Sequence, residues 1–163
     1  MTGALLGTLL VAATVATGLT AGFLAAFAHT VMPALGTADD AAFVGTFQAA
    51  DRAVYNPWFM VPFTLAPVLT GAALLLTFAD QEPATVAVVA GAFVLAVATV
   101  VITGTVHLPL NREIGEVPLD GGAAALAAAR ARFERRWVRW NVVRTVTATV
   151  SFVCLAVALL LVR

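Results

Sequence analysis

The two histidines of the chain both follow long apolar runs and both lie close to a proline. His29 precedes Pro33, and His107 precedes Pro109. A neutral imidazole can remove a proton at pH 7, because the ordinary pKa of histidine is about 6.5. Imidazole is also a frequent metal ligand. The histidines are therefore candidates for a general base or for metal or haem ligands.

Amide side chains and one arginine lie at the same ends of the apolar runs. Asn56 and Asn111 are two of these amides. On the last apolar stretch, a polar stripe repeats at i, i+3, i+7 and i+10, which places its members on one helix face. Its members are Glu134, Trp137, Asn141 and Arg144. An arginine at lipid depth costs several kcal/mol unless it finds a partner or reaches the surface. We expect Arg144 to face inward, where Asn141 and Glu134 on the same helix face give it partners.

Two cofactor arrangements are compatible with these residues. His29, His107 and Glu134 together imitate a 2-His-1-carboxylate metal site. Alternatively, His29 and His107 could be the axial ligands of a b-type haem in a four-helix bundle. The haem arrangement is less favoured, because both histidines lie at span ends beside proline. No ligand spacing is diagnostic, so dioxygen chemistry without a cofactor stays open as well.

Each of these residues also has a structural explanation. Histidines can end a span, asparagines often cap helices, and Arg144 can reach the lipid headgroups. The arginines between residues 130 and 139 can form a solvated surface facing anionic lipid. A non-catalytic membrane subunit or a small-molecule binder is therefore an alternative to an enzyme. The gathering of polar groups at one end of the apolar runs favours a site.

The elements that position these residues are four long apolar runs. Of the 163 residues, 61% are hydrophobic and 11% are charged, whereas soluble domains have roughly 25% charged residues. The runs cover about 4–28, 57–79, 84–106 and 137–162, and each approaches the ~20 residues of a spanning helix. The sequence predicts an all-α integral membrane protein whose single domain, residues 1–163, is a four-helix transmembrane bundle.

The connections between the runs are unequal. Residues 80–83 form one tight turn, whereas the long segments 29–56 and 107–141 must lie on the opposite face. The first long segment contains a short amphipathic helix with Asp39 or Asp40 as its N-cap. Its apolar face is predicted to hold Ala42, Phe43, Phe47 and Val54. From Ala123 onward no Gly or Pro occurs, so one helix should extend about four turns beyond the membrane. The Trp137 and Trp140 rings should lie at the membrane interface. The two halves form a weak parallel repeat.

Arginine distribution predicts the orientation. Most arginines fall on the long-loop face, and Arg163 is alone on the other. The positive-inside rule then makes the long loops cytoplasmic and both termini external, in the cell (inner) membrane. The formal net charge is zero, so no nucleic-acid partner is expected. The only cysteine is Cys154, so no intrachain disulfide can form. The sequence allows a homo-oligomer.

Four elements of the sequence are His29-x-x-Met32-Pro33, Asn56-Pro57, Pro109-Leu110-Asn111 and Trp137-x-x-Trp140-Asn141-x-x-Arg144. Together these elements resemble the DUF1772, or anthrone oxygenase-like, family of four-span membrane proteins. Most members have no assigned activity, but some fungal relatives are regarded as oxygenases that convert an anthrone into an anthraquinone. The resemblance implies site positions at His29, Asn56, Asn111, Trp140, Asn141 and Arg144.

The resemblance suggests a lipophilic, anthrone-like or polyphenolic substrate and dioxygen as partners within the lipid bilayer. In this hypothesis, His29 is the general base, and Arg144 and Asn141 hold the developing oxyanion. The substrate is expected to contact Asn56, Asn111, His107, Trp137 and Trp140, with Met32 and Phe59 as further apolar walls.

Overall fold

The computed structural model describes residues 2–162, apart from the side chains of Thr2 and Asp80. Within this range, every regular element is helical. Four long helices form the bundle: α1 (Thr2–Ala26), α4 (Pro57–Asp80), α5 (Pro83–Ile102) and α7 (Ala123–Leu161). In the bundle, α1 packs against α4 and α7, and α5 packs against the same two helices. α1 and α5 are therefore diagonal to each other, as are α4 and α7.

The surface of the bundle is suited to lipid. Large apolar side chains are exposed along all four long helices, among them Leu19, Val68, Val94 and Val146. The four helices are also long and apolar enough to cross a membrane. Water would make such an exposed apolar surface unfavourable, whereas lipid does not. The predicted class, an all-α multi-pass membrane protein, is confirmed.

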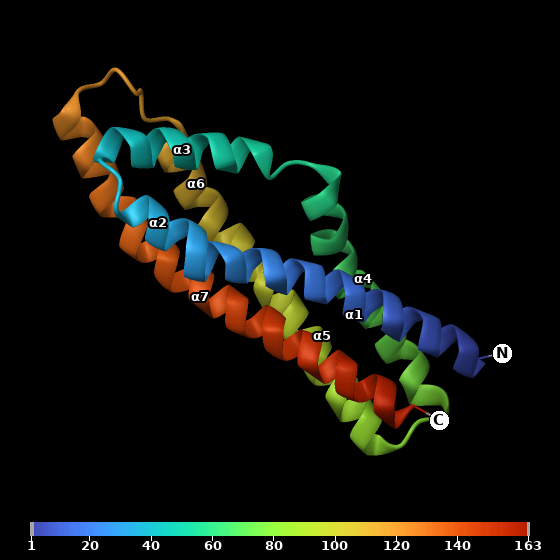
Figure 1. The fold of residues 1–163 in the computed structure, drawn as a ribbon. Coiled ribbons are helices and arrows are strands. Elements are labelled where there is room, and N and C mark those ends of the chain that lie inside the picture. The colour runs from blue at the N-terminus through green and yellow to red at the C-terminus, as the bar shows by residue number, and fades with distance from the viewer. Residues whose placement is uncertain (1, 163) are drawn as a thin grey trace.

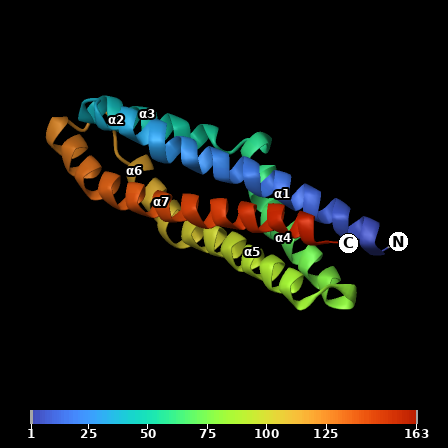
Figure 2. The same ribbon diagram turned by 60° about the horizontal axis from the view of Figure 1, so that its bottom comes forward.

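Both chain ends lie at one end of the bundle, beside the short turn between α4 and α5 (Figures 1 and 2). The long connecting segments gather at the other end, where α3 (Asp40–Ala53) lies alongside the bundle and packs against α7. At the end with the chain termini, all four long helices contribute to a tightly packed apolar core. This core contains Leu6, Leu10, Ala13, Ala73, Val89, Ala92, Leu155 and Ala158. Space for a ligand is therefore to be sought near the long connections.

The first and third long helices do not end where the apolar runs end. After α1, a π-helical turn, η1 (Phe27–Val31), leads into α2 (Met32–Gly36). After α5, a second π-helical turn, η2 (Thr103–His107), leads into α6 (Leu108–Gly115). The expected span ends at 28 and 106 thus fall inside continuous helical segments. Each π turn ends two residues before a proline, whose ring clashes with the carbonyl four residues earlier in a regular α-helix.

The two π turns have the same register relative to their prolines. The N–H of Met32 donates to the Phe27 carbonyl, and the N–H of Leu108 donates to the Thr103 carbonyl. Both bonds span five residues, and both donors directly precede the proline. Because α1 and α5 are also diagonal in the bundle, the two halves can be matched as a parallel repeat through Pro33 and Pro109, but this match does not pair His29 with His107 as the sequence suggested.

A second apolar core lies at the end of the bundle with the long connections. α3 begins at the N-cap Asp39, whose carboxylate accepts from the Ala42 N–H at 2.8 Å, as the sequence predicts. Phe43 and Phe47 are buried against α7, but Ala42 is exposed. The predicted apolar face is therefore wrong at Ala42, because the buried face of α3 is rotated toward Val44 and Gln48.

The extension of α7 supports this second core. α7 is unbroken from Ala123 to Leu161, which confirms the predicted continuous helix. Trp137 is buried in this core, so its ring packs against protein rather than lipid; its predicted depth at the membrane interface stays a prediction.

Arg130 fastens the turn between α2 and α3 to α7. Its guanidinium donates to the carbonyls of Gly36 and Ala38, at 2.9 and 2.8 Å, and pairs with Asp40 and Glu134. The expectation that this arginine is part of a solvated surface is wrong. Arg130 supplies hydrogen-bond donors to carbonyl groups that the end of a helix leaves without partners.

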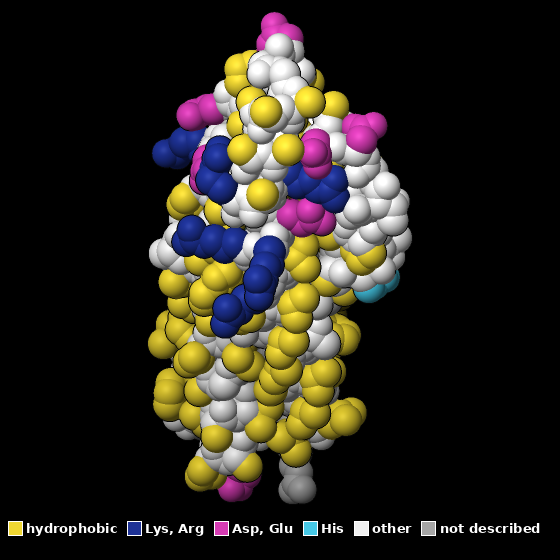
Figure 3. All heavy atoms as spheres, turned by 90° about the vertical axis from the view of Figure 1, so that its left-hand side faces the viewer, with side chains coloured by type: hydrophobic (Ala, Val, Ile, Leu, Met, Phe, Trp, Pro, Cys, Tyr) yellow, Lys and Arg dark blue, Asp and Glu magenta, His cyan; other side chains and the backbone are white. Residues whose placement is uncertain are grey.

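The exposed arginines of α7 form a band at the boundary of the apolar surface; they are Arg132, Arg135, Arg136 and Arg139. Figure 3 shows Lys/Arg side chains gathered between the apolar body of the bundle and the tip with the long connections. Arg163, used in the orientation argument, lies outside the described residues. The cytoplasmic placement of this band stays a prediction.

Candidate functional site

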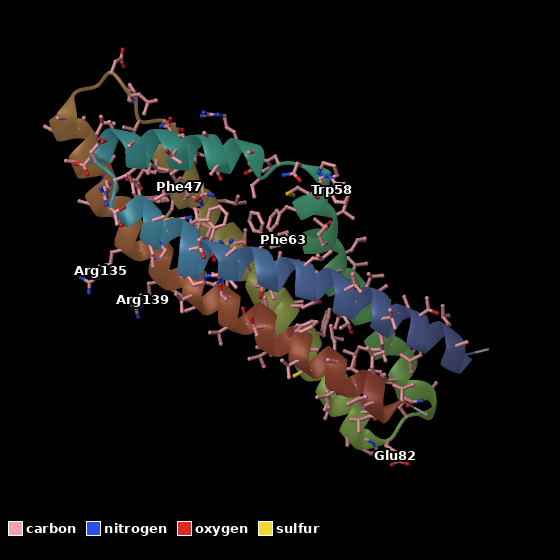
Figure 4. All side chains as sticks on the ribbon, in the orientation of Figure 1. Phe47, Trp58, Phe63, Glu82, Arg135 and Arg139 are labelled. Carbon is pink, nitrogen blue, oxygen red and sulfur yellow. The ribbon has the colours of Figure 1, made fainter. Side chains whose placement is uncertain are left out.

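A cavity of about 200 Å³ lies between the two cores, next to the π turns. Its walls are largely aromatic. In Figure 4, Phe47 and Phe63 point toward the interior of the molecule, whereas Trp58, Arg135 and Arg139 point outward. The exposed side chains of Tyr55 and Leu108 mark its opening. The lining residues are Phe23, Leu24, Phe27, Phe47, Ala50, Asp51, Val54, Tyr55, Phe59, Met60, Phe63, Thr103, His107, Leu108, Asn111, Trp137, Asn141 and Arg144.

Arg144 provides a buried cation at this cavity. Its side chain is 6% exposed, and its Nη1 and Nη2 donate to Thr103 Oγ1 at 3.1 Å and Asn141 Oδ1 at 2.8 Å. Its Nε has no hydrogen-bond partner among the described residues. Arg144 is also absent from the ion pairs found within residues 2–162. A buried charge without a carboxylate partner is costly, and a free donor at a cavity can be satisfied by a ligand.

Asn141 holds the guanidinium from one turn earlier on α7. Its side chain is fully buried, and its Nδ2 donates to the Leu24 carbonyl of α1 at 3.2 Å. Because this amide binds α1 with one end and Arg144 with the other, it fixes both the helix contact and the arginine. The polar stripe predicted on α7 thus has Trp137, Asn141 and Arg144 lining one cavity.

His107 is the histidine that lines the cavity. It is 1% exposed, and its ring lies edge-on to Trp137, with centroids 5.2 Å apart and planes at 83°. Within the described part of the chain, neither ring nitrogen has a hydrogen-bond partner. Buried polar groups normally have partners, so His107 is available to a molecule in the cavity.

His29 lies outside the cavity. Its side chain is exposed, and its Nδ1 is 2.7 Å from the hydroxyl of Thr30. The cause is register: His29 stands four residues before Pro33, but His107 stands two residues before Pro109. A difference of two residues turns a side chain by about 200° around a helix. Thr105, which matches His29 in register, is exposed as well.

Three other predicted positions do not line the cavity. Asn56 is the N-cap of α4: its Oδ1 accepts from the Phe59 N–H at 3.2 Å, and its Nδ2 donates to the Ala53 carbonyl. Trp140 is partly buried elsewhere on α7. Glu134 is paired with Arg130 at 2.7 Å. Of the predicted apolar walls, Phe59 lines the cavity, whereas Met32 is buried in the neighbouring core.

The candidate metal and haem ligands do not converge. His107 faces the cavity, His29 faces outward, and Glu134 binds an arginine. No group of three or more His, Cys, Asp and Glu side chains arranged to hold a metal occurs among residues 2–162. The two histidines likewise do not face each other across one space, as the axial ligands of a haem would.

Asn111 lines the cavity as part of a hydrogen-bonded chain. Trp137 Nε1 donates to Asn111 Oδ1 at 2.9 Å, and Asn111 Nδ2 donates to Asp51 Oδ1 at 2.6 Å. Asp51 was missed in the sequence. It follows the buried Phe47 by four residues on α3, so its place on the apolar face of an amphipathic helix was the available signal.

The site as a whole can bind a flat apolar molecule with an oxygen at one end. Engineered cavities of about 150 Å³ bind benzene, so a larger ring system can enter this one and project through its opening. Arg144 can meet a negative oxygen, and His107 can accept a proton in the same space. The fold and site define a four-helix membrane protein with an aromatic-walled cavity that is lined by a buried cation and a buried imidazole.

Comparison with known families gives this class a name. Residues 55–154 match the family model described as anthrone oxygenase. The match covers more than half of the 163 residues, and the chain belongs to the anthrone oxygenase family. The matched range includes His107, Asn111, Trp137, Asn141 and Arg144 but neither His29 nor Asp51. At family level this supports an oxygenase-like role in the membrane. Neither a curated protein nor a solved structure matches the chain.

Proposed function

We propose that this protein is a membrane oxygenase that oxidises a flat, lipophilic aryl ketone with an acidic benzylic C–H, as in an anthrone. One observation supports this most: His107 and Arg144 line the same cavity with unpartnered nitrogens. The family membership agrees with this chemistry. The substrate and dioxygen both dissolve in hydrocarbon, so both can reach the cavity from the bilayer.

Neutral His107 is the general base in this proposal. It removes a proton from the benzylic carbon, and the charge moves through the rings to the ketone oxygen. Arg144 holds that oxyanion through its free Nε–H, while Asn141 and Thr103 keep the guanidinium in place. This assignment replaces the base expected from the sequence, His29, which lies outside the cavity.

Dioxygen completes the reaction with balanced atoms and electrons. The carbanion adds to O₂ to form a C–O bond, and the resulting peroxide takes the proton from His107. Loss of the second C–H proton and of hydroxide then breaks the O–O bond and forms a carbonyl. The net change converts a CH₂ group and O₂ into C=O and water. The steps assigned to His107 and Arg144 require no metal, and a metal analysis of the active preparation tests the metal-assisted alternative.

The experiment uses the full chain in lipid nanodiscs with anthrone as the probe. Oxygen uptake and anthraquinone absorbance are measured against empty nanodiscs, which correct for spontaneous oxidation. His107→Ala should lower the enzymatic rate by about 10²–10⁴-fold. His29→Ala is the matched control and should keep the wild-type rate, because this histidine is exposed and outside the cavity.

Two results would overturn the proposal. One is a wild-type rate equal to that of empty nanodiscs although anthrone binds, which would assign the cavity a binding role alone. The other is a folded His107→Ala variant with an undiminished rate.

A further inference from the structure

The hydrogen-bonded chain at the cavity has a fixed direction. An indole Nε1–H can only donate, so the Asn111 group that meets Trp137 must be its oxygen. The Asn111 amide nitrogen therefore points to Asp51, and that contact is 2.6 Å long. The orientation of Asp51 is thus set by two residues on two other helices, α6 and α7.

One oxygen of Asp51 remains available to a ligand. Within the described residues, the hydrogen bonds of this carboxylate involve Oδ1 alone, and no ion pair includes Asp51. The side chain is partly buried and lines the cavity. Burial raises the pKa of the Asp51 carboxyl, and the Asn111 hydrogen bond and the neighbouring Arg52 oppose this rise. A partly desolvated carboxylate favours a hydrogen-bond donor in its vicinity.

The two polar ends of the cavity differ in chemistry. Arg144 and His107 are almost fully buried, whereas Asp51 is partly buried and precedes the exposed Tyr55 by four residues. Trp137 lies next to both polar groups. The Cζ of Arg144 is 5.8 Å from the centroid of the Trp137 ring, and Nε1 of Trp137 donates to Asn111, the partner of Asp51. A ligand that satisfies both ends has an acceptor oxygen at one end and a donor at the other.

We infer that Asp51 is a specificity-determining residue that selects ring systems with a hydroxyl group at the end distant from the ketone. This inference rests on the proposed function for the orientation of the ketone toward Arg144. Asn111 and Trp137 are positioning residues that aim the carboxylate. A ligand hydroxyl donates to Asp51 Oδ2, and the ring system lies along Trp137 between the two ends.

The test measures binding of inert ligands rather than turnover. The probes are 2-hydroxyanthraquinone and 2-methoxyanthraquinone, which differ in the donor and have similar ring systems. Both are titrated into the full chain in nanodiscs at a pH where the phenol is protonated, with tryptophan fluorescence as the readout and empty nanodiscs as the blank. The wild type should bind the hydroxy ligand roughly 10–100-fold more tightly, as expected for a hydrogen bond to a charged group.

Asp51→Ala should remove this preference by weakening the hydroxy ligand alone. Asp51→Asn keeps an acceptor for Asn111 but puts an NH2 donor in the place of Oδ2, so this variant should also lose the preference. Because it has nearly the same shape as the aspartate, it guards against a folding defect in the alanine variant. Glu116→Gln, an exposed acid outside the cavity, is the control and should leave the preference unchanged.

The outcomes separate this inference from the proposed function. If both ligands bind the wild type equally, or if Asp51→Ala weakens both by the same factor, the selection by Asp51 is wrong and the oxygenase proposal is unaffected. If neither ligand binds the wild type, the cavity assignment fails and both proposals fall. An oxygenase assay without turnover but with an intact hydroxyl preference would overturn the proposed function alone.

Discussion

Arg144 and Asn141 are joined by a hydrogen bond of 2.8 Å from the guanidinium Nη2 to the amide Oδ1, one turn apart on α7. The acceptor is a neutral amide, so the guanidinium is positioned without being neutralised. A carboxylate at the same place would hold Arg144 equally well but would supply the negative charge that we assign to the substrate.

The first prediction uses this difference. Asn141→Asp should keep Arg144 in place as a buried ion pair but lower kcat/KM for anthrone by roughly 10²-fold, because the oxyanion then competes with a carboxylate. Steady-state kinetics in nanodiscs measure the effect, with a thermal melt to confirm folding. An Asn141→Asp variant with wild-type kcat/KM would contradict the role of Arg144 as the oxyanion partner.

The second prediction separates function from packing at Arg144. Removing a buried, unpaired cation recovers several kcal/mol of desolvation, whereas the Asn141 oxygen left without a donor costs about 1–3 kcal/mol. Arg144→Met should therefore abolish turnover without lowering the free energy of unfolding. Arg139→Met, at an exposed position of the same helix, should change neither quantity. A strongly destabilised Arg144→Met protein would show that the cluster serves packing.

The third prediction concerns the fastening of α2 and α3 by Arg130. Arg130→Ala leaves the carbonyls of Gly36 and Ala38 without this donor and removes two ion pairs. The free energy of unfolding should fall by about 2–4 kcal/mol. Hydrogen exchange should rise in residues 36–40, while the exposed-site control Arg135→Ala leaves exchange there unchanged. Equal exchange in the two variants would refute the fastening role.

The fourth prediction is a pH dependence at Asp51. Its folded-state pKa is raised above the ordinary 3.8, chiefly by burial. The ionised form therefore costs stability at neutral pH, and this cost disappears as the pH falls through the raised pKa toward 3.8. Asp51→Asn should melt at a higher temperature than wild type at pH 7, and the difference should shrink toward pH 3.8. Melting curves across this range check the sign; a difference that grows on acidification would contradict it.

The fifth prediction concerns orientation. If the arginine band faces the cytoplasm, a periplasmic phosphatase fused after Arg163 should be active. The same reporter inserted at Asp120, in the loop at the other end of the bundle, should be inactive. The reverse pattern would place the cavity opening on the external side.

The helices could be predicted because their signals are local. Run length and the absence of Gly and Pro after Ala123 predicted the unbroken α7, and Asp39 had the chemistry of an N-cap. The stripe on α7 also predicted that Asn141 and Arg144 share a face. These inferences need only the helical period and the chemistry of single residues.

The site was predicted less well because it depends on register across the π turns. His29 and His107 look equivalent in the sequence, and the two-residue difference from their prolines decides which one lines the cavity. Trp137 was expected at the membrane interface, but the packing of α3 over α7 buries it. The spacing of Asp51 from Phe47 indicated the buried face of α3, but its contact with Asn111 is a long-range one that depends on how α3 packs over the bundle.

The two π turns also have a consequence for how the chain tolerates change in length. The backbone hydrogen bond that closes each π turn spans five residues, one more than the bond that closes a regular α-helical turn. Deleting one residue within 103–107 would restore regular pairing and rotate everything after it, including Asn111, by about 100° relative to α5. Single-residue deletions there should therefore damage the protein more than substitutions at the same positions. Changes in length should be tolerated better in the loop at 118–121, which lies outside the helices.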